Sequence, residues 1–184
     1  MTVFNVLVSS AYLLVAGIFI VAAWHKLADT KRFQKVLDDY AILPAGLVKI
    51  LAPVLPLVEL LTAGLLSLST VLPEFSIAGL GLALLLLAAY TFALLTLFLQ
   101  GRALEDCGCG GSANQPLGVW PVLRNVSLVI ICLILLSGNG VSVFVPNMSF
   151  VAIGLFIVFS LVYWIVDGLM KNSVFVTVLE KHYD

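Results

Sequence analysis

Long apolar runs along the chain predict five membrane-crossing helices. These runs occupy residues 3–24, 50–72, 75–99, 119–137 and 149–170. A helix needs about 20 residues to cross a hydrocarbon core of about 30 Å, and each run has close to this length. Lipid offers no partners for free backbone groups, and the alternation typical of a membrane barrel is absent. We therefore expect an all-α integral membrane protein.

A shorter amphipathic segment separates the first two runs. Apolar and charged residues alternate there at helical spacing, which predicts a short helix along the membrane surface. The apolar face has Phe33, Val36, Leu37, Tyr40 and Ala41, and the charged or polar face has Lys31, Arg32, Gln34, Lys35, Asp38 and Asp39. The full pattern predicts a four-helix transmembrane bundle over residues 1–137. A fifth transmembrane helix and a short polar tail would follow over residues 138–184.

Composition agrees with a chain that lies in the lipid bilayer. Of the 184 residues, 62% are hydrophobic and 10% are charged, whereas soluble domains carry roughly 25% charged residues. The mean hydropathy is +1.17. A net charge of -1, with no phosphate-binding loop and no long basic run, argues against a nucleic-acid partner. The first apolar run lacks the basic start and the cleavage site of a secretory signal, so we expect it to remain as a helix.

The positive charges predict the orientation of the chain in the membrane. Lysine and arginine fall in the first loop, the third loop and the tail, whereas the N-terminus and the second and fourth loops have none. By the positive-inside rule, the N-terminus faces outward and the third loop faces the cytoplasm. The residues counted are Lys26, Lys31, Arg32, Lys35, Lys49, Arg102, Lys171 and Lys181.

The third loop contains a pair of thiols in the stretch "DCGCGG". Cys107 and Cys109 are separated by Gly108, which eases the bend that a disulfide between them would require. So small a ring is strained, and strained, exposed disulfides are labile, which suits exchange better than stapling. Two other readings stay open: an inert pair, or two ligands for a soft metal such as copper(I) or mercury. Cys132, inside a helix, is expected to be a small buried apolar residue.

Glu59, in "LPLVELLTAG", is an ionisable residue deep within a span. Such a group costs about 2.5–3.5 kcal/mol on insertion scales and needs a partner. Arg124 is the partner that the sequence suggests, in either a structural bridge or a proton relay. Asn125 is expected to form an interhelical hydrogen bond. Lys26 ends the first helix on the side of the membrane where the thiols lie.

Four segments in this order resemble the MauE/DoxX family of redox-associated membrane proteins, which includes MauE-like methylamine utilisation proteins. They are "AWHKLADTKRFQKVLDDYAILP", "LPLVEL", "GRALEDCGCGG" and "WPVLRN", within residues 15–137. The resemblance implies a helical bundle in the bacterial plasma membrane that supports disulfide formation or thiol redox maturation of exported proteins, beside a thioredoxin-like partner. Among the positions that match the family, the resemblance implies a chemical role only for the two cysteines. The matching positions are Lys26, Tyr40, Pro44, Glu59, Cys107, Cys109, Arg124 and Asn125.

Three functions follow as hypotheses. In the first, Cys107 and Cys109 are the reacting groups of a thiol-disulfide redox protein, supported by the matching charged and polar positions. Electron exchange with a membrane quinone is left open, since no quinone motif is visible. In the second, the chain is an accessory or structural subunit of a larger membrane complex, with the helix at 149–170 as a partner surface. In the third, the thiols carry a soft metal, copper or mercury.

The orientation predicts how the thiols react in intact cells. Because the charges place Cys107 and Cys109 on the cytoplasmic side, a membrane-impermeant maleimide should leave them unlabelled until the cells are permeabilised. The measurement is the mass shift of the protein, with and without prior reduction. Labelling of intact cells after reduction alone would instead indicate a disulfide that faces outward.

Overall fold

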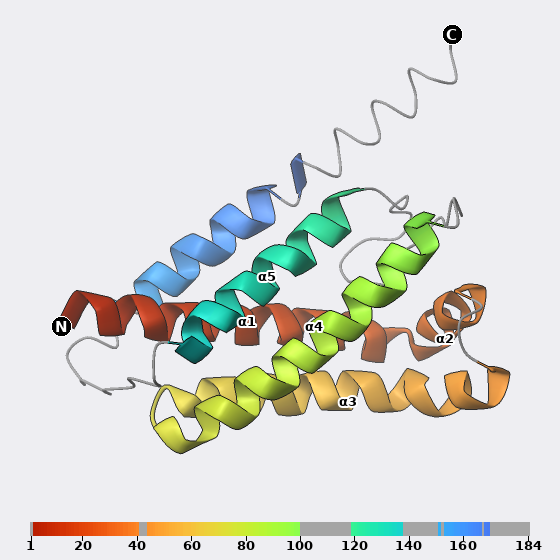
Figure 1. Ribbon diagram of the computed structural model, residues 1–184, viewed down its shortest axis with the longest axis horizontal. Coiled ribbons are helices and arrows are strands. Elements are labelled where there is room, and N and C mark those ends of the chain that lie inside the picture. The colour runs from red at the N-terminus through yellow and green to blue at the C-terminus, as the bar shows by residue number, and fades with distance from the viewer. Residues whose placement is uncertain are drawn as a thin grey trace, which may run out of the picture.

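The computed structural model of the chain describes residues 2–40, 44–99, 119–137, 151, 153–166, 168 and 169. Every regular element within these ranges is helical, so the predicted all-α class is confirmed. Cys107 and Cys109 lie outside the described residues. The elements are α1 (Thr2–Ala28), α2 (Thr30–Asp39), α3 (Ala45–Ser69), the short 3-10 helix η1 (Pro73–Phe75), α4 (Ser76–Leu99) and α5 (Val119–Ser137), and residues 153–166 form a further helical stretch (Figure 1).

The helix α3 lies at the centre of the packing. It contacts α1, α2, α4 and η1, and α5 packs on the other side of α4. Only η1 and a few turn residues separate α3 from α4, so these two helices form the tight antiparallel hairpin that the sequence predicts. As a result, the end of α4 and the start of α5 lie at the same end of the bundle as α2 (Figure 1).

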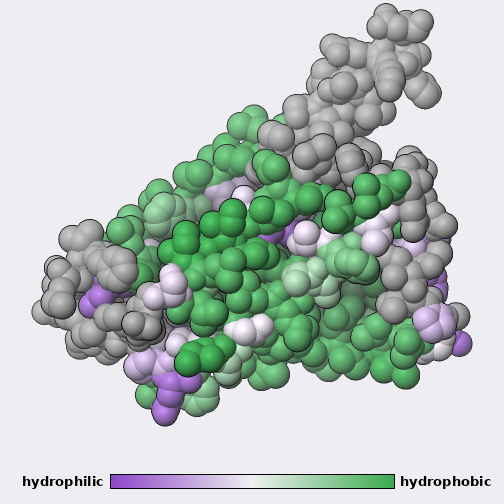
Figure 2. Space-filling view, viewed as in Figure 1, coloured by the Kyte–Doolittle hydropathy of each residue, from purple (hydrophilic) through white to green (hydrophobic). Residues whose placement is uncertain are grey.

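The outer surface is suited to lipid. Large aliphatic side chains such as Leu57, Leu85 and Ile134 are more than half exposed, and apolar residues cover most of the face seen in Figure 2. Within the part of the chain that the structure describes, three helical segments are long and apolar enough to cross a membrane, namely residues 5–28, 46–69 and 73–97. The apolar helices at 121–137 and 153–166 are shorter, so the count of five spans stays a prediction. The chain is a multi-pass membrane protein.

The interior is mostly apolar, and several of its serine and threonine hydroxyls donate within their own helix. Thr62 donates to the carbonyl oxygen of Val58 at 2.8 Å, and Ser69 donates to that of Leu66 at 2.6 Å. Such bonds within a helix leave little need for hydroxyl partners on neighbouring helices. The main core cluster joins four helices through Tyr12, Val15, Ala16, Phe19, Ala63, Leu66, Leu80, Ala83, Leu86, Leu87, Leu128, Cys132 and Leu135. Cys132 is thus fully buried, as expected.

The amphipathic helix α2 packs against the bundle through its apolar face. Asp29 caps its start, where a side-chain oxygen accepts a hydrogen bond from the Arg32 backbone N–H at 3.0 Å. Phe33 and Leu37 then pack on the first half of α3, against Val48 and Ala52. On a second side, Val36 and Tyr40 pack against Leu97 of α4. The helix α2 therefore covers the part of α3 that lies beyond the end of α1.

The backbones of α3 and α4 approach closely at Gly79. A Cβ atom there would lie 3.2 Å from the Leu66 backbone nitrogen and 3.3 Å from the Leu65 carbonyl carbon. These distances are shorter than ordinary van der Waals contacts. In lipid, burial of apolar surface does not drive helices together, and van der Waals packing between helices does so instead. Small residues allow the helices to approach closely enough for this packing.

We therefore expect Gly79→Leu to lower the free energy of unfolding by about 1–3 kcal/mol, because α3 and α4 must separate to accept the side chain. The matched control is Gly81→Leu, on an exposed part of α4 where a Cβ atom would have no neighbour within 4 Å. Its effect should stay within about 0.5 kcal/mol. Unfolding in mild detergent measures both, and equal stability of the two variants would contradict the close contact at Gly79.

Candidate functional site

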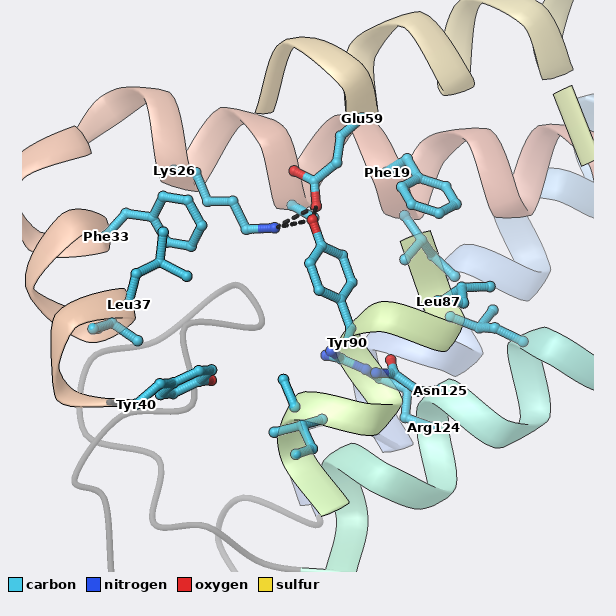
Figure 3. A pocket seen from close by; sticks show the side chains of 16 residues that line it. Phe19, Lys26, Phe33, Leu37, Tyr40, Glu59, Leu87, Tyr90, Arg124 and Asn125 are labelled. Carbon is cyan, nitrogen blue, oxygen red and sulfur yellow. Dashed lines mark hydrogen bonds and ion pairs between the residues drawn. The ribbon is translucent and has the colours of Figure 1, made fainter. Parts of the chain in front are cut away.

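Three polar side chains from three helices meet inside the bundle. Lys26 of α1 forms an ion pair with Oε1 of Glu59 on α3. The Tyr90 hydroxyl of α4 donates to the same oxygen at 2.7 Å, and Lys26 Nζ donates to the Tyr90 hydroxyl at 3.2 Å. Lys26 is 5% exposed and Glu59 is 0% exposed. Figure 3 shows the triangle that these groups form.

Aromatic rings surround the Lys26 ammonium. Its Nζ lies 4.5 Å from the centroid of the Tyr90 ring and 5.2 Å from that of the Phe33 ring. Both distances permit cation-π attraction, which strengthens when the cation is desolvated. Lys26 also lies in the last turn of α1, where the helix dipole favours a positive charge. The cation therefore has several sources of stabilisation besides Glu59.

The two oxygens of Glu59 differ sharply in their surroundings. Oε1 accepts from both Lys26 and Tyr90. Oε2 is buried, and none of the described residues donates a hydrogen bond to it. A buried acceptor without a donor costs about 1–3 kcal/mol. A salt bridge with a purely structural role would be more stable if both carboxylate oxygens accepted hydrogen bonds.

A cavity of about 60 Å³ lies beside this triangle. Its walls come from α1, α2, α3, α4 and α5, and Figure 3 shows their side chains converging on it. This volume is smaller than the roughly 150 Å³ of a cavity that accommodates benzene. It is lined by Ile18, Phe19, Ala22, Lys26, Phe33, Val36, Leu37, Tyr40, Glu59, Leu87, Tyr90, Ala93, Leu94, Arg124, Asn125 and Leu128.

The structure corrects two of the sequence-based interpretations. Glu59 pairs with Lys26 rather than with Arg124, although Arg124 lines the same cavity. The charge pattern assigns Lys26 to the first loop, but this residue belongs to α1 and is buried. Both corrections follow from the way in which the helices pack. Because α2 covers the first half of α3, α1 ends beside the middle of α3. That offset brings the last turn of α1 level with Glu59.

Asn125 is also buried at this cavity. It is 3% exposed and lines the cavity. Its side-chain nitrogen has no hydrogen-bond acceptor among the described residues, and the interhelical hydrogen bond expected of Asn125 stays a prediction. Sequence reasoning also missed Tyr90, although a tyrosine in the middle of the apolar run "LAAYTFALL" was a signal that a hydroxyl lies inside the bundle.

The arrangement can hold a small polar molecule and can stabilise charge in the membrane interior. No group of three or more histidine, cysteine or acidic side chains suited to a metal occurs in the described ranges. Cys107 and Cys109 fall outside these ranges, so the soft-metal hypothesis stays a prediction.

Fold and site define a multi-pass helical membrane protein with a buried, hydrogen-bonded ion pair beside a small, largely apolar cavity. The family model of the methylamine utilisation protein MauE matches residues 4–138, and the chain belongs to this MauE family. A curated relative, the methylamine utilization protein MauE of Paracoccus denitrificans, is 32% identical over 124 residues. The match covers 67% of this chain and 64% of that protein. No solved structure matches the chain.

Removal of Lys26 should destabilise the bundle. We expect Lys26→Met to lower the free energy of unfolding by about 3–5 kcal/mol, because it leaves a buried carboxylate without its cation. The double variant Lys26→Met/Glu59→Leu should be more stable than Lys26→Met alone, since neither charge is then buried. Unfolding in detergent measures both, with exposed Lys49→Met as the control. A double variant less stable than Lys26→Met would argue against the pair as the source of the loss.

Proposed function

We propose that this chain is a membrane component of a methylamine-utilisation system and exchanges disulfides with partner proteins through Cys107 and Cys109. The family to which the chain belongs supports the first part of the proposal. The spacing of the two thiols supports the second, because a strained disulfide between them would be readily exchanged. A thioredoxin-like protein is the proposed partner.

The observation that carries the proposal is the position of the cavity and of the Lys26–Glu59 pair beside it. The chain leaves α4 at Leu99 and enters α5 at Val119, and the intervening residues include both cysteines. Leu94 and Arg124, within two turns of these points, both line the cavity. The cysteine-bearing segment therefore joins the bundle beside its concentration of charged and hydrogen-bonding groups.

The proposed reaction is a thiol-disulfide exchange in two steps. A partner thiolate attacks the Cys107–Cys109 disulfide, forming a mixed disulfide and releasing one thiolate of this chain. The second partner thiolate then attacks the mixed disulfide, which leaves a disulfide in the partner and two thiols here. Two electrons and two protons have passed from the partner to this chain. Arg124 brings a permanent positive charge to this end of the bundle, and cations near a thiol favour its thiolate.

Repeated turnover needs an acceptor for the two electrons. A membrane quinone, which takes up two electrons and two protons on reduction to the quinol, is the class of acceptor that we propose.

The double variant Cys107→Ser/Cys109→Ser should lose all mixed disulfides with partner proteins, because no exchangeable sulfur remains in the loop. Cys132→Ala is the matched control, since its thiol is buried in the core, and it should form mixed disulfides at the unaltered level. Acid trapping, thiol alkylation and non-reducing electrophoresis measure the adducts. Undiminished adducts in the double variant would overturn the proposal, and stoichiometric partners that co-purify regardless of the cysteines would favour an accessory subunit.

A further inference from the structure

The depth of α2 in the membrane follows from its neighbours. It connects two candidate membrane spans, at residues 5–28 and 46–69, and lies at the end of the bundle where α3 begins (Figure 1). Its apolar face packs against Val48 of α3, and the adjacent Lys49 is exposed. A lysine that faces outward from a span is unfavourable in hydrocarbon and favourable among headgroups. This turn of α3, and α2 beside it, therefore lie at the level of the lipid headgroups.

The exposed charges of α2 run against the helix dipole. Lys31 and Arg32 lie in its first turn and Lys35 in its second. Asp38 and Asp39 lie in its last turn, and all of these side chains are exposed. The N-terminus of a helix favours negative charges and its C-terminus favours positive ones. These charges therefore do not stabilise α2 by themselves, whereas an anion outside the helix would be favourable beside its first two turns.

Lys31 and Lys35 form a pair of like charges on one side of α2. They are four residues apart, so they project from adjacent turns of the helix. Neither lysine forms an ion pair within the described ranges, although Asp39 lies four residues beyond Lys35. Like charges at this spacing destabilise a helix. An anion that contacts both ammonium groups would remove that repulsion.

The surroundings of α2 favour a lipid as the source of that anion. A bilayer supplies phosphate groups at the depth at which α2 lies. Further along α3, towards the interior of the membrane, Ile50 is 60% exposed and Val54 is 41% exposed. These side chains offer contacts to acyl chains, which a free phosphate ion lacks. At the opposite end of the bundle, the turn around η1 at residues 69–76 contains Glu74 and neither lysine nor arginine.

We propose that the first two turns of α2 form a docking surface for an anionic phospholipid, with the headgroup phosphate between Lys31 and Lys35. The phosphodiester carries one negative charge and two unesterified oxygens, so it can accept a charge-assisted hydrogen bond from each ammonium group. Phosphatidylglycerol has no other charge, whereas the choline cation of phosphatidylcholine would be repelled by the same lysines. The surface does not depend on the proposed thiol exchange, because none of its groups is a cysteine.

Native mass spectrometry of the full chain in a charge-neutral detergent tests the proposal. Palmitoyl-oleoyl phosphatidylglycerol and palmitoyl-oleoyl phosphatidylcholine have the same acyl chains, so the dissociation constants of their first adducts differ through the headgroup. A lysine near an anionic lipid contributes about a five-fold gain in affinity, so we expect phosphatidylglycerol to bind about 25-fold more tightly. Equal affinities for the two lipids would overturn the proposal. Displacement of phosphatidylglycerol by millimolar inorganic phosphate would also overturn it, because the occupant would then be a free anion.

The variant Lys31→Gln/Lys35→Gln tests whether the lipid docks on α2. Both side chains are exposed, so the bundle should fold unchanged while the preference for phosphatidylglycerol is lost. The matched control, Asp38→Asn/Asp39→Asn, also removes two exposed charges from α2 and should keep the preference. A lysine variant that still prefers phosphatidylglycerol would exclude these two residues as the docking surface. The thiol-exchange assay has a separate readout, so either proposal can fail without the other.

Discussion

The buried ion pair between Lys26 and Glu59 is the constraint on which the arrangement of the helices depends. Each ion costs several kcal/mol to remove from water, and only close pairing with further hydrogen bonds offsets that cost. Glu59 lies near the middle of α3, so α1 must place its last turn there. The chain then turns, and α2 covers the first half of α3 with Phe33 and Leu37. Tyr90 completes the triangle and links α4 to the same point.

Apolar packing alone would not fix this register. Lipid is as apolar as the leucines on the outer faces of the helices, so burial gives little preference for one axial offset over another. Two kinds of contact supply the preference. At Gly79 the absence of a side chain admits the α3 backbone. At Glu59 the ion pair sets the offset of α1 against α3, because a slip of one turn would leave both charges unpaired in a medium that cannot solvate them.

These contacts explain which parts of the fold could be predicted from the sequence and which could not. The apolar runs predicted α4 to within one residue and α5 at its observed bounds, because a lipid-facing helix must be apolar along its whole length. The end of α1 was placed at residue 24 rather than at Ala28, since a lysine signals the edge of a span unless a partner is known. The pairing of Glu59 with Arg124 failed for a related reason, because Lys26 was counted among the first-loop charges. The offset between α1 and α3, which brings Lys26 to Glu59, is a tertiary property that no local pattern records.

The polar groups at the two ends of the bundle have different kinds of hydrogen-bond partner. At the other end of the bundle, Ser69 and Thr70 donate to carbonyls of their own helix, so they place no demand on neighbouring helices. A buried ion pair often gives no more stability than well-packed apolar residues of similar volume. The Lys26–Glu59 pair therefore contributes mainly by fixing the offset of α1 against α3 rather than by adding net stability. Both residues of the pair line the cavity that Leu94 and Arg124 line from near the end of α4 and the start of α5, so the contacts that fix the helix offset also lie at the end of the bundle where the cysteine-bearing segment joins it.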